Sequence, residues 1–212
     1  NKVLTASNDL TVKLWDVQTS QLLKTYSGFD ADSYGRRDIY SLNVSPDGKR
    51  FITTGTDCII RIWDIASGEI VKEWDGEHSW NCSSDGWCGA TNARYAGDGK
   101  YIITCDFGGK VKVWDKEGNF IKDIEGHDLE VKAVDISSDR QYIATGSRDK
   151  TVKLWDFNTA QLIKVFKGHT GAVNQVNFAA DGSILTASED QTAKLWDLAG
   201  NILLNIDGHG DN

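Results

Sequence analysis

A threonine, an aspartate and a histidine recur in the second half of the chain, and nucleophilic catalysis uses these residue types. Thr145 and Asp149 lie close together, with His127 upstream. The same three types return further along the chain at His169, Thr186 and Asp190. A catalytic nucleophile needs an accessible position and an oxyanion hole. The chain has no Gly-x-Ser-x-Gly elbow or similar motif. We therefore interpret the set as structural, and we expect no catalytic residue, no metal and no cofactor.

The stretch around Thr145 belongs to a repeat that ends in a Trp-Asp pair. The five tryptophans of these pairs are Trp15, Trp63, Trp114, Trp155 and Trp196. Successive tryptophans are 48, 51, 41 and 41 residues apart. A nearly constant period in this range predicts a repeat architecture.

Each repeat reads as a series of short strands. In the fourth copy, the sequence predicts strands at residues 131–136, 141–146, 151–155 and 162–166. They are rich in β-branched and aromatic residues, with turn signals about every 8 to 12 residues. No window shows helical periodicity over three turns. The pattern predicts an all-β fold.

The motifs resemble those of the WD40-repeat family over the full length of the chain. The chain contains Gly-His lead-ins, Ser/Thr-x-x-x-Asp turns and five Trp-Asp ends. This resemblance implies four-stranded blades arranged radially as a β-propeller. The five expected blades are approximately residues 1–26, 39–74, 90–124, 131–166 and 173–206.

The size of the ring is a separate question. The first copy lacks its first strand, and the last copy runs into a Gly-His lead-in whose strand is not in the sequence. Propellers that resemble this chain usually have seven blades. We expect residues 1–212 to be part of a larger, seven-bladed propeller, incomplete at both ends; a five-bladed ring is the alternative.

The resemblance also implies a hydrogen-bonded set in each blade, formed by the Gly-His histidine, a second-strand Ser or Thr, the turn Asp and the Trp. A buried indole N–H and a buried imidazole both need polar partners. By position, the set comprises His127, Thr145, Asp149 and Trp155; His169, Thr186, Asp190 and Trp196; Thr5, Asp9 and Trp15; and Thr53, Asp57 and Trp63.

Two copies depart from this pattern. In the second copy, Phe29 follows the glycine where histidine is expected. In the third copy, Gly108 replaces the turn Asp, and His78 follows Glu77 rather than Gly. We expect these two blades to be less rigid or to be held by other contacts.

The loops that precede these two blades are also longer than the others. Residues 27–38 and 75–89 replace a six-residue connection. Because they belong to one loop class, both rise from the same face, here called the top face, and insertions on one face often mark binding. Trp, Tyr and Arg are enriched at interface hot spots. The candidate partner-binding residues are Phe29, Tyr34, Arg36, Arg37, Trp80, Trp87, Phe107 and Arg148. The alternative is that Trp80 and Trp87 cover their own blades and that Phe107 packs locally.

The composition limits the partners. The 212 residues carry a net charge of −8 without a run of Lys or Arg, so nucleic acid is not the expected main partner. No apolar run approaches the length of a membrane span, so no membrane insertion is expected. Four cysteines are too few for a disulfide scaffold, which favours an intracellular, cytoplasmic location. Cys82 and Cys88 are interpreted as thiols, with a loop disulfide as the alternative.

These observations predict a non-catalytic protein–protein interaction scaffold that is a subunit or domain of a larger assembly. It would bind one or more proteins on the top face. One alternative is a ligand-sensing or autoinhibitory module of a larger multidomain signalling protein. The other is an enzyme built on a propeller.

Overall fold

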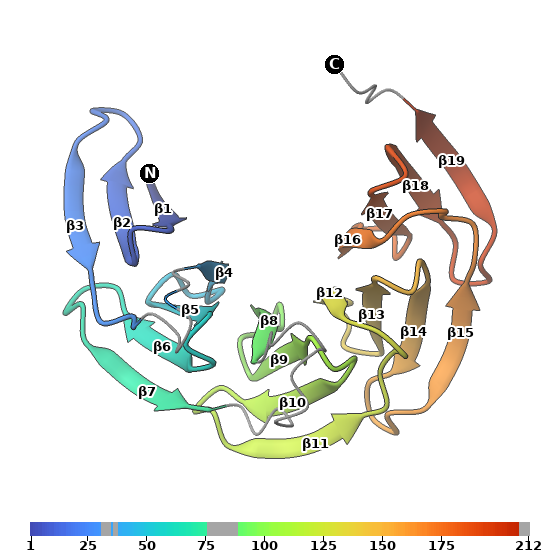
Figure 1. The fold of residues 1–212 in the computed structure, drawn as a ribbon, viewed down its shortest axis with the longest axis horizontal. Coiled ribbons are helices and arrows are strands. Elements are labelled where there is room, and N and C mark those ends of the chain that lie inside the picture. The colour runs from blue at the N-terminus through green and yellow to red at the C-terminus, as the bar shows by residue number, and fades with distance from the viewer. Residues whose placement is uncertain (31–34, 36–37, 76–88, 208–212) are drawn as a thin grey trace.

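The computed structural model describes residues 1–30, 35, 38–75 and 89–207, and these residues form strands and turns but no helix. Nineteen strands make five antiparallel sheets, one with three strands and four with four strands. The sheets stand side by side along an open arc, with the first and last sheets at its tips (Figure 1). The expected all-β architecture of propeller blades is confirmed, whereas the number of blades in a full ring stays a prediction.

Each sheet is a simple antiparallel meander that runs from the inside of the arc to its outer edge (Figure 1). The first sheet contains β1 (Lys2–Ser7), β2 (Thr11–Asp16) and β3 (Leu22–Tyr26). The second contains β4 (Ile39–Val44), β5 (Arg50–Gly55), β6 (Ile60–Asp64) and β7 (Ile70–Trp74). The third contains β8 (Ala90–Tyr95), β9 (Tyr101–Asp106), β10 (Val111–Asp115) and β11 (Phe120–Ile124). The fourth contains β12 (Val131–Ile136), β13 (Tyr142–Ser147), β14 (Val152–Asp156) and β15 (Leu162–Phe166). The fifth contains β16 (Val173–Phe178), β17 (Ile184–Ser188), β18 (Thr192–Trp196) and β19 (Ile202–Asp207).

The turns between the first two strands of each complete sheet share one backbone requirement. Each turn has one residue in the left-handed region, which is Gly48, Gly99 or Gly182 in three sheets, at φ angles of 67°, 68° and 85°. Glycine adopts this conformation without a side-chain clash. In the fourth sheet, Arg140 adopts it at φ 59°, at a cost of about 1–2 kcal/mol. The turn geometry is therefore kept even where the sequence does not favour it.

The hydrophobic core lies between neighbouring sheets rather than within any one sheet. At the first junction, Leu14 and Tyr26 of the first sheet pack against Phe51 and Trp63 of the second. The rings of Phe51 and Trp63 are stacked with centroids 5.7 Å apart, and Trp63 is 1% exposed. The tryptophans that occupy the other three junctions are Trp114, Trp155 and Trp196. Since each fully buried large apolar side chain contributes about 1.5–3 kcal/mol, every blade depends on its neighbour for stability.

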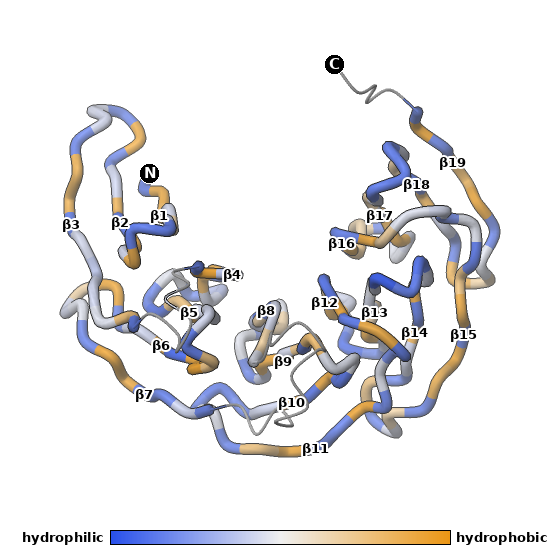
Figure 2. Tube along the Cα trace, viewed as in Figure 1, coloured by the Kyte–Doolittle hydropathy of each residue, from blue (hydrophilic) through white to orange (hydrophobic). Residues whose placement is uncertain are grey.

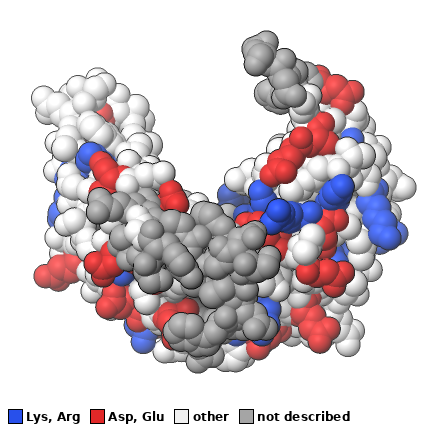
Figure 3. Space-filling model, viewed as in Figure 1, with Lys and Arg blue, Asp and Glu red and all other residues white. Residues whose placement is uncertain are grey.

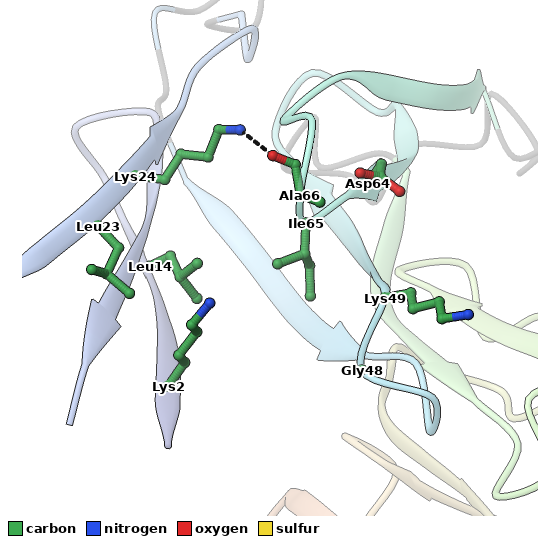
Figure 4. Close-up of a pocket in the computed structure, with 9 residues that line it drawn as sticks. All are labelled: Lys2, Leu14, Leu23, Lys24, Gly48, Lys49, Asp64, Ile65 and Ala66. Atoms are coloured by element: carbon green, nitrogen blue, oxygen red, sulfur yellow. Dashed lines mark hydrogen bonds between the residues drawn. The ribbon is translucent and has the colours of Figure 1, made fainter. Parts of the chain in front are cut away.

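Outer-strand lysines hold adjacent sheets together from outside. Lys24 on β3 donates to the carbonyl of Ala66 in the β6–β7 turn at 2.7 Å (Figure 4). Lys122 on β11 likewise donates to the carbonyls of Phe157 and Asn158 in the next sheet. The ammonium group satisfies carbonyls at the turn, so the repeated lysines of the outer strands belong to the frame.

The last sheet breaks this pattern. Leu204 on β19 occupies the position that lysine has in the other outer strands and is 50% exposed. Ile206 is 48% exposed, whereas the matching Tyr26 and Phe166 are 1% and 2% exposed. Hydrophobic residues run along β19 at the tip of the arc (Figure 2). In the other sheets, this face packs against the following blade. In the fifth sheet, no sheet lies against it in the described part of the chain.

Polar side chains of the inner strands cross-link adjacent sheets. Asn43 on β4 accepts a hydrogen bond from the backbone N–H of Tyr95 on β8 at 2.9 Å. Asp135 on β12 accepts one from the N–H of Phe178 on β16 at 2.8 Å and also binds Arg94 Nη1 at 3.0 Å. Each acceptor satisfies a backbone donor at the inner edge of the next sheet, where an unpaired donor would be costly.

Replacing Asp135 by alanine should lower the free energy of unfolding by about 1–3 kcal/mol, because the Phe178 N–H and Arg94 lose a half-buried acceptor. Asp135→Asn keeps one carbonyl oxygen and should recover most of this loss. Urea denaturation of the three proteins tests the assignment, and equal stability of the Ala variant and the wild type contradicts it.

Candidate functional site

Four side chains of the fourth blade are joined in a row by hydrogen bonds. Trp155 Nε1 donates to Thr145 Oγ1 at 2.9 Å, and Thr145 Oγ1 lies 2.7 Å from His127 Nε2. On the other side of the ring, His127 Nδ1 lies 2.7 Å from Asp149 Oδ2. One arrangement of protons satisfies every contact: the indole donates to the hydroxyl, the hydroxyl donates to Nε2, and Nδ1–H donates to the carboxylate. This row of hydrogen bonds links β13 and β14 to the lead-in segment of the blade.

The fifth blade repeats this geometry. His169 Nδ1 lies 2.8 Å from Asp190 Oδ2, and His169 Nε2 lies 2.7 Å from Thr186 Oγ1. Trp196 Nε1 donates to Thr186 Oγ1 at 2.9 Å. The two complete sequence motifs thus have the same side-chain arrangement, and each fixes the turn between its second and third strands.

The arrangement does not suit nucleophilic catalysis. The Thr145 side chain is fully buried, and its hydroxyl is occupied by both the indole and the imidazole. No substrate atom could approach it without opening the blade. The threonine, histidine and aspartate therefore act as a structural unit.

The aspartates of these sets have strongly shifted pKa values. Burial acts to raise the pKa of Asp149, but hydrogen bonds from His127 and Thr151 outweigh it and hold the pKa well below its usual value. Burial also opposes the shift at Asp190, where bonds from Thr192, the Thr170 N–H and His169 lower the pKa. The ionised carboxylates consequently stabilise both turns at neutral pH.

The first blade has the tryptophan bond without the histidine. Trp15 Nε1 donates to Thr5 Oγ1 at 2.9 Å. Asp9 is exposed and accepts from the Thr11 side chain at 2.6 Å and from Lys13 at 3.2 Å. Asp9 thus organises its own turn.

The second blade replaces the histidine network with a different one. Trp63 Nε1 donates to Thr53 Oγ1 at 2.9 Å. Asp57 instead pairs with Arg61 Nη1 at 2.6 Å, and both side chains are almost fully buried. The Arg61 guanidinium also lies 5.4 Å from the centre of the Phe29 ring. The arginine therefore supplies the partner that the missing histidine would have given to the aspartate.

Phe29 corrects one expectation. We expected it to contact a partner, but it is 8% exposed and its ring centre lies 5.1 Å from that of Trp63. It follows Gly28 in the place of the histidine, and an apolar ring is most stable against the indole. Two positions of the second copy differ together from the other copies: Phe29 stands in place of the histidine, and Arg61 stands in place of a lysine. This joint change is the sequence signal for the role of Phe29.

The third blade keeps the bond from Trp114 Nε1 to Thr104 Oγ1 at 2.9 Å. Its turn glycines, Gly108 and Gly109, have a consequence that the sequence interpretation missed. The N–H of His127 donates to the Gly109 carbonyl at 2.8 Å, and a side chain at Gly109 would collide with the His127 carbonyl. Glycine lets the lead-in segment of the fourth blade lie directly on this turn. The loss of the aspartate is thus matched by a closer contact between blades.

The described stems of the two inserted loops converge on one turn of the second blade. The N–H of Asp38 donates to Thr56 Oγ1 at 3.2 Å, and the N–H of Asp30 donates to Asp57 at 3.4 Å. Gly89, which ends the second loop, lies so close to Cys58 that an added Cβ would be 2.8 Å from its Cα. The turn 56–58 is therefore a common anchor for both loops. The loop residues Tyr34, Arg36, Arg37, Trp80 and Trp87, with His78, Cys82 and Cys88, lie outside the described residues.

The two remaining candidates lie on the top-face rim of the arc. Phe107 is half-buried, and its ring packs edge-on against Tyr40 of the preceding blade with centres 5.5 Å apart. Arg148 is exposed. At the matching junction of the next two blades, Lys132 pairs with Glu189 at 2.9 Å. The rim thus changes from aromatic at the second and third blades to charged at the fourth and fifth.

Removal of Arg61 in the second blade should destabilise the fold more than removal of Lys153, which occupies the matching position in the fourth blade. We expect Arg61→Ala to lower the free energy of unfolding by about 3–5 kcal/mol, because it leaves Asp57 buried without a counter-charge. The matched control is Lys153→Ala, which should cost less because Asp149 is bound by His127. Adding Asp57→Asn to Arg61→Ala should restore part of the loss. Chemical denaturation measures all four proteins, and equal losses at the two positions argue against this role of Arg61.

The shifted aspartates predict acid sensitivity with a defined direction. Because folding lowers the pKa of Asp149 below its ordinary value of 3.8, its contribution to stability is complete above that pH. It is lost progressively as the pH falls below this value toward the folded-state pKa. The stability difference between the wild type and Asp149→Asn should therefore shrink on acidification. Urea titrations at a series of pH values test this, and a difference independent of pH contradicts it.

Comparison with known proteins gives the family. The model of the WD domain, G-beta repeat, matches residues 20–64, 78–115, 118–156 and 160–197. A ribosome biogenesis protein WDR12 homolog of Drosophila persimilis is 32% identical over 105 residues, which cover 46% of this chain and 24% of that protein. Eukaryotic translation initiation factor 3 subunit I of Candida albicans is 31% identical over 194 residues, which cover 81% of this chain and 53% of that protein.

A third relative, nuclear distribution protein PAC1 of Candida tropicalis, is 35% identical over 71 residues, which cover 33% of this chain and 14% of that protein. The chain spans about half the length, or less, of the curated relatives it matches. The matched repeats cover most of the chain, and the same tryptophan-to-threonine bond holds every blade. The chain therefore belongs to the WD40 family of G-beta repeats.

Proposed function

We propose that the chain is a non-catalytic protein-interaction scaffold that binds partners on its top face, through the inserted loops 27–38 and 75–89. The observation that carries the proposal is the common anchor of the two loops. Their described stems contact Thr56, Asp57 and Cys58, three consecutive residues of one turn. Two long loops that are anchored at one turn of a rigid frame can contact the same partner.

The names of the relatives support a role in assemblies. One relative is named as a ribosome biogenesis protein and another as a subunit of a translation initiation factor. A subunit acts through its contacts with other proteins, and an intracellular scaffold fits both names. Protein partners within a larger assembly are consequently favoured over small-molecule substrates.

The mechanism is preorganisation. The anchoring turn is held by the ion pair between Asp57 and Arg61. Phe29 lies against the guanidinium of this pair and packs on Trp63. A binding loop on a fixed turn loses less conformational entropy when a partner binds. The blades thus set the position of the loops, and the loops supply Trp, Tyr and Arg side chains of the kind that dominate interface energies.

The arc is further proposed to be part of a larger, seven-bladed propeller. The uncovered face of the last sheet, with Leu204 and Ile206 half exposed, supports this. At the other tip, Val3 is 47% exposed, whereas the matching Phe51 is fully buried against the preceding sheet. The two tips therefore present the two complementary halves of a blade junction, and additional blades would cover both.

The loop residues give the test of the binding face. Trp80→Ala, Trp87→Ala and Tyr34→Ala should each weaken the capture of protein partners from a cell extract, while the melting temperature stays close to that of the wild type. The matched control is Phe120→Ala, which removes an aromatic side chain that is 45% exposed on an outer strand. Quantitative mass spectrometry of captured proteins compares the variants. Unchanged capture by all three loop variants would falsify the assignment of the binding face.

A further inference from the structure

Arg148 stands out on the top-face rim because its guanidinium forms no close ion pair with the carboxylates near it, Glu130 and Glu189. It is exposed, and its guanidinium makes no hydrogen bond or ion pair with any residue of the described ranges. Its backbone is nevertheless fixed, because the Arg148 N–H donates to the Glu130 carbonyl at 2.9 Å. The next residue, Asp149, is locked by His127. The exposed guanidinium is thus presented from a fixed backbone position.

An apolar surface adjoins this arginine. Leu129 is 50% exposed and immediately precedes Glu130, the residue that binds the Arg148 backbone. The Leu129 carbonyl accepts from Ser147 Oγ at 3.3 Å and also lies against the turn glycine Gly109. An exposed leucine costs little free energy by itself. The backbone of Leu129, however, is held from two sides, by β13 and by the turn of the third blade.

The aromatic pair continues this surface toward the inserted loops. Phe107 belongs to the same turn as Gly109, on which the Leu129 carbonyl rests. Its ring packs against Tyr40. From the second blade to the fourth, the rim therefore carries Tyr40 and Phe107, which pack on each other, then the exposed Leu129 and Arg148.

The charges around Arg148 limit what it can bind. Burial raises the pKa of Glu130, and Lys132 and Arg148 oppose this shift. Glu189 pairs with Lys132, and this hydrogen bond lowers the pKa of the Glu189 carboxyl. Figure 3 shows Lys and Arg side chains over the fourth and fifth blades, with acidic side chains between and around them. A polyanion such as RNA would meet these carboxylates, and the net charge of −8 would repel it further. A single carboxylate brings one negative charge instead of many, so it meets less repulsion than a polyanion and can form a charge-assisted hydrogen bond with the guanidinium.

We propose that this rim binds a protein segment in which an Asp or Glu side chain stands next to a large apolar side chain. The carboxylate pairs with Arg148, and the apolar side chain packs on Leu129. Planar guanidinium and carboxylate groups form paired hydrogen bonds, which give both energy and orientation. The inference rests on the proposed scaffold function and names the chemistry of the partner segment.

Selection of a random peptide display library on the immobilised chain provides the test. The peptides that bind should carry an acidic residue beside Leu, Ile, Phe or Trp, and Arg148→Ala should weaken their binding about ten- to hundredfold. Leu129→Ser should weaken the same peptides. The matched control is Lys116→Ala, which removes an exposed cation from the β10–β11 turn on the opposite face and should leave binding unchanged.

Charge reversal makes the test specific. A selected peptide whose acidic residue is changed to Arg should lose binding to the wild type and regain it with Arg148→Glu. Selection of peptides without acidic residues, equal binding to Arg148→Ala, or binding that needs only the carboxyl terminus of the peptide overturns the inference. Tighter binding of a random RNA pool with the same dependence on Arg148 also overturns it.

Affinity capture separates this inference from the scaffold proposal. If the wild type captures a protein partner that Arg148→Ala retains fully while the loop variants lose it, the scaffold proposal stands and the inference about the rim fails. If neither class of variant changes what is captured, both fail.

Discussion

A buried indole N–H is costly without an acceptor, and the tryptophan of the Trp-Asp pair that closes each repeat has one in every blade. In all five blades, the tryptophan donates to a threonine hydroxyl of the second strand at 2.9 Å. This bond sets the register of the second and third strands and points the indole at the preceding sheet. Because the core lies between sheets, the same bond also positions the side chain that joins one blade to the next.

The side chains around this hydrogen bond differ from blade to blade. Histidine and aspartate complete it in the fourth and fifth blades, whereas Arg61, Asp57 and Phe29 do so in the second. In the third blade, two glycines admit the neighbouring lead-in segment. Each solution leaves a different upper surface on its blade. The blades with complete networks have short lead-ins, and the second and third blades, whose networks are altered, follow the long loops. Variation in the frame and variation in loop length therefore occur in the same blades.

The repeat made much of the fold predictable. A fixed period, Trp-Asp ends and turn residues identify the strands, because these features depend on local pattern and on backbone requirements. The role of Phe29 could not be derived in that way, because an aromatic residue in a long loop has the composition of both an anchor and a core side chain. The burial of Phe29 and its contact with the Trp63 ring decide between them. The sequence also did not predict the common anchor at Thr56, Asp57 and Cys58, because this anchor joins segments that are distant in sequence. The roles of five loop residues stay predictions: Tyr34, Arg36, Arg37, Trp80 and Trp87.

Rigidity and recognition are connected through the turns. Where a network fixes the turn aspartate, the residue before it is presented in a constant place, and Arg148 is presented in this way by Asp149 and His127. Such a side chain gives up little backbone freedom when it binds, so a single ion pair at the rim can contribute more than the same pair on a mobile loop. The frame motif therefore does not bind partners itself. It fixes the backbone of the residues next to it, so that a side chain such as Arg148 projects from a constant position.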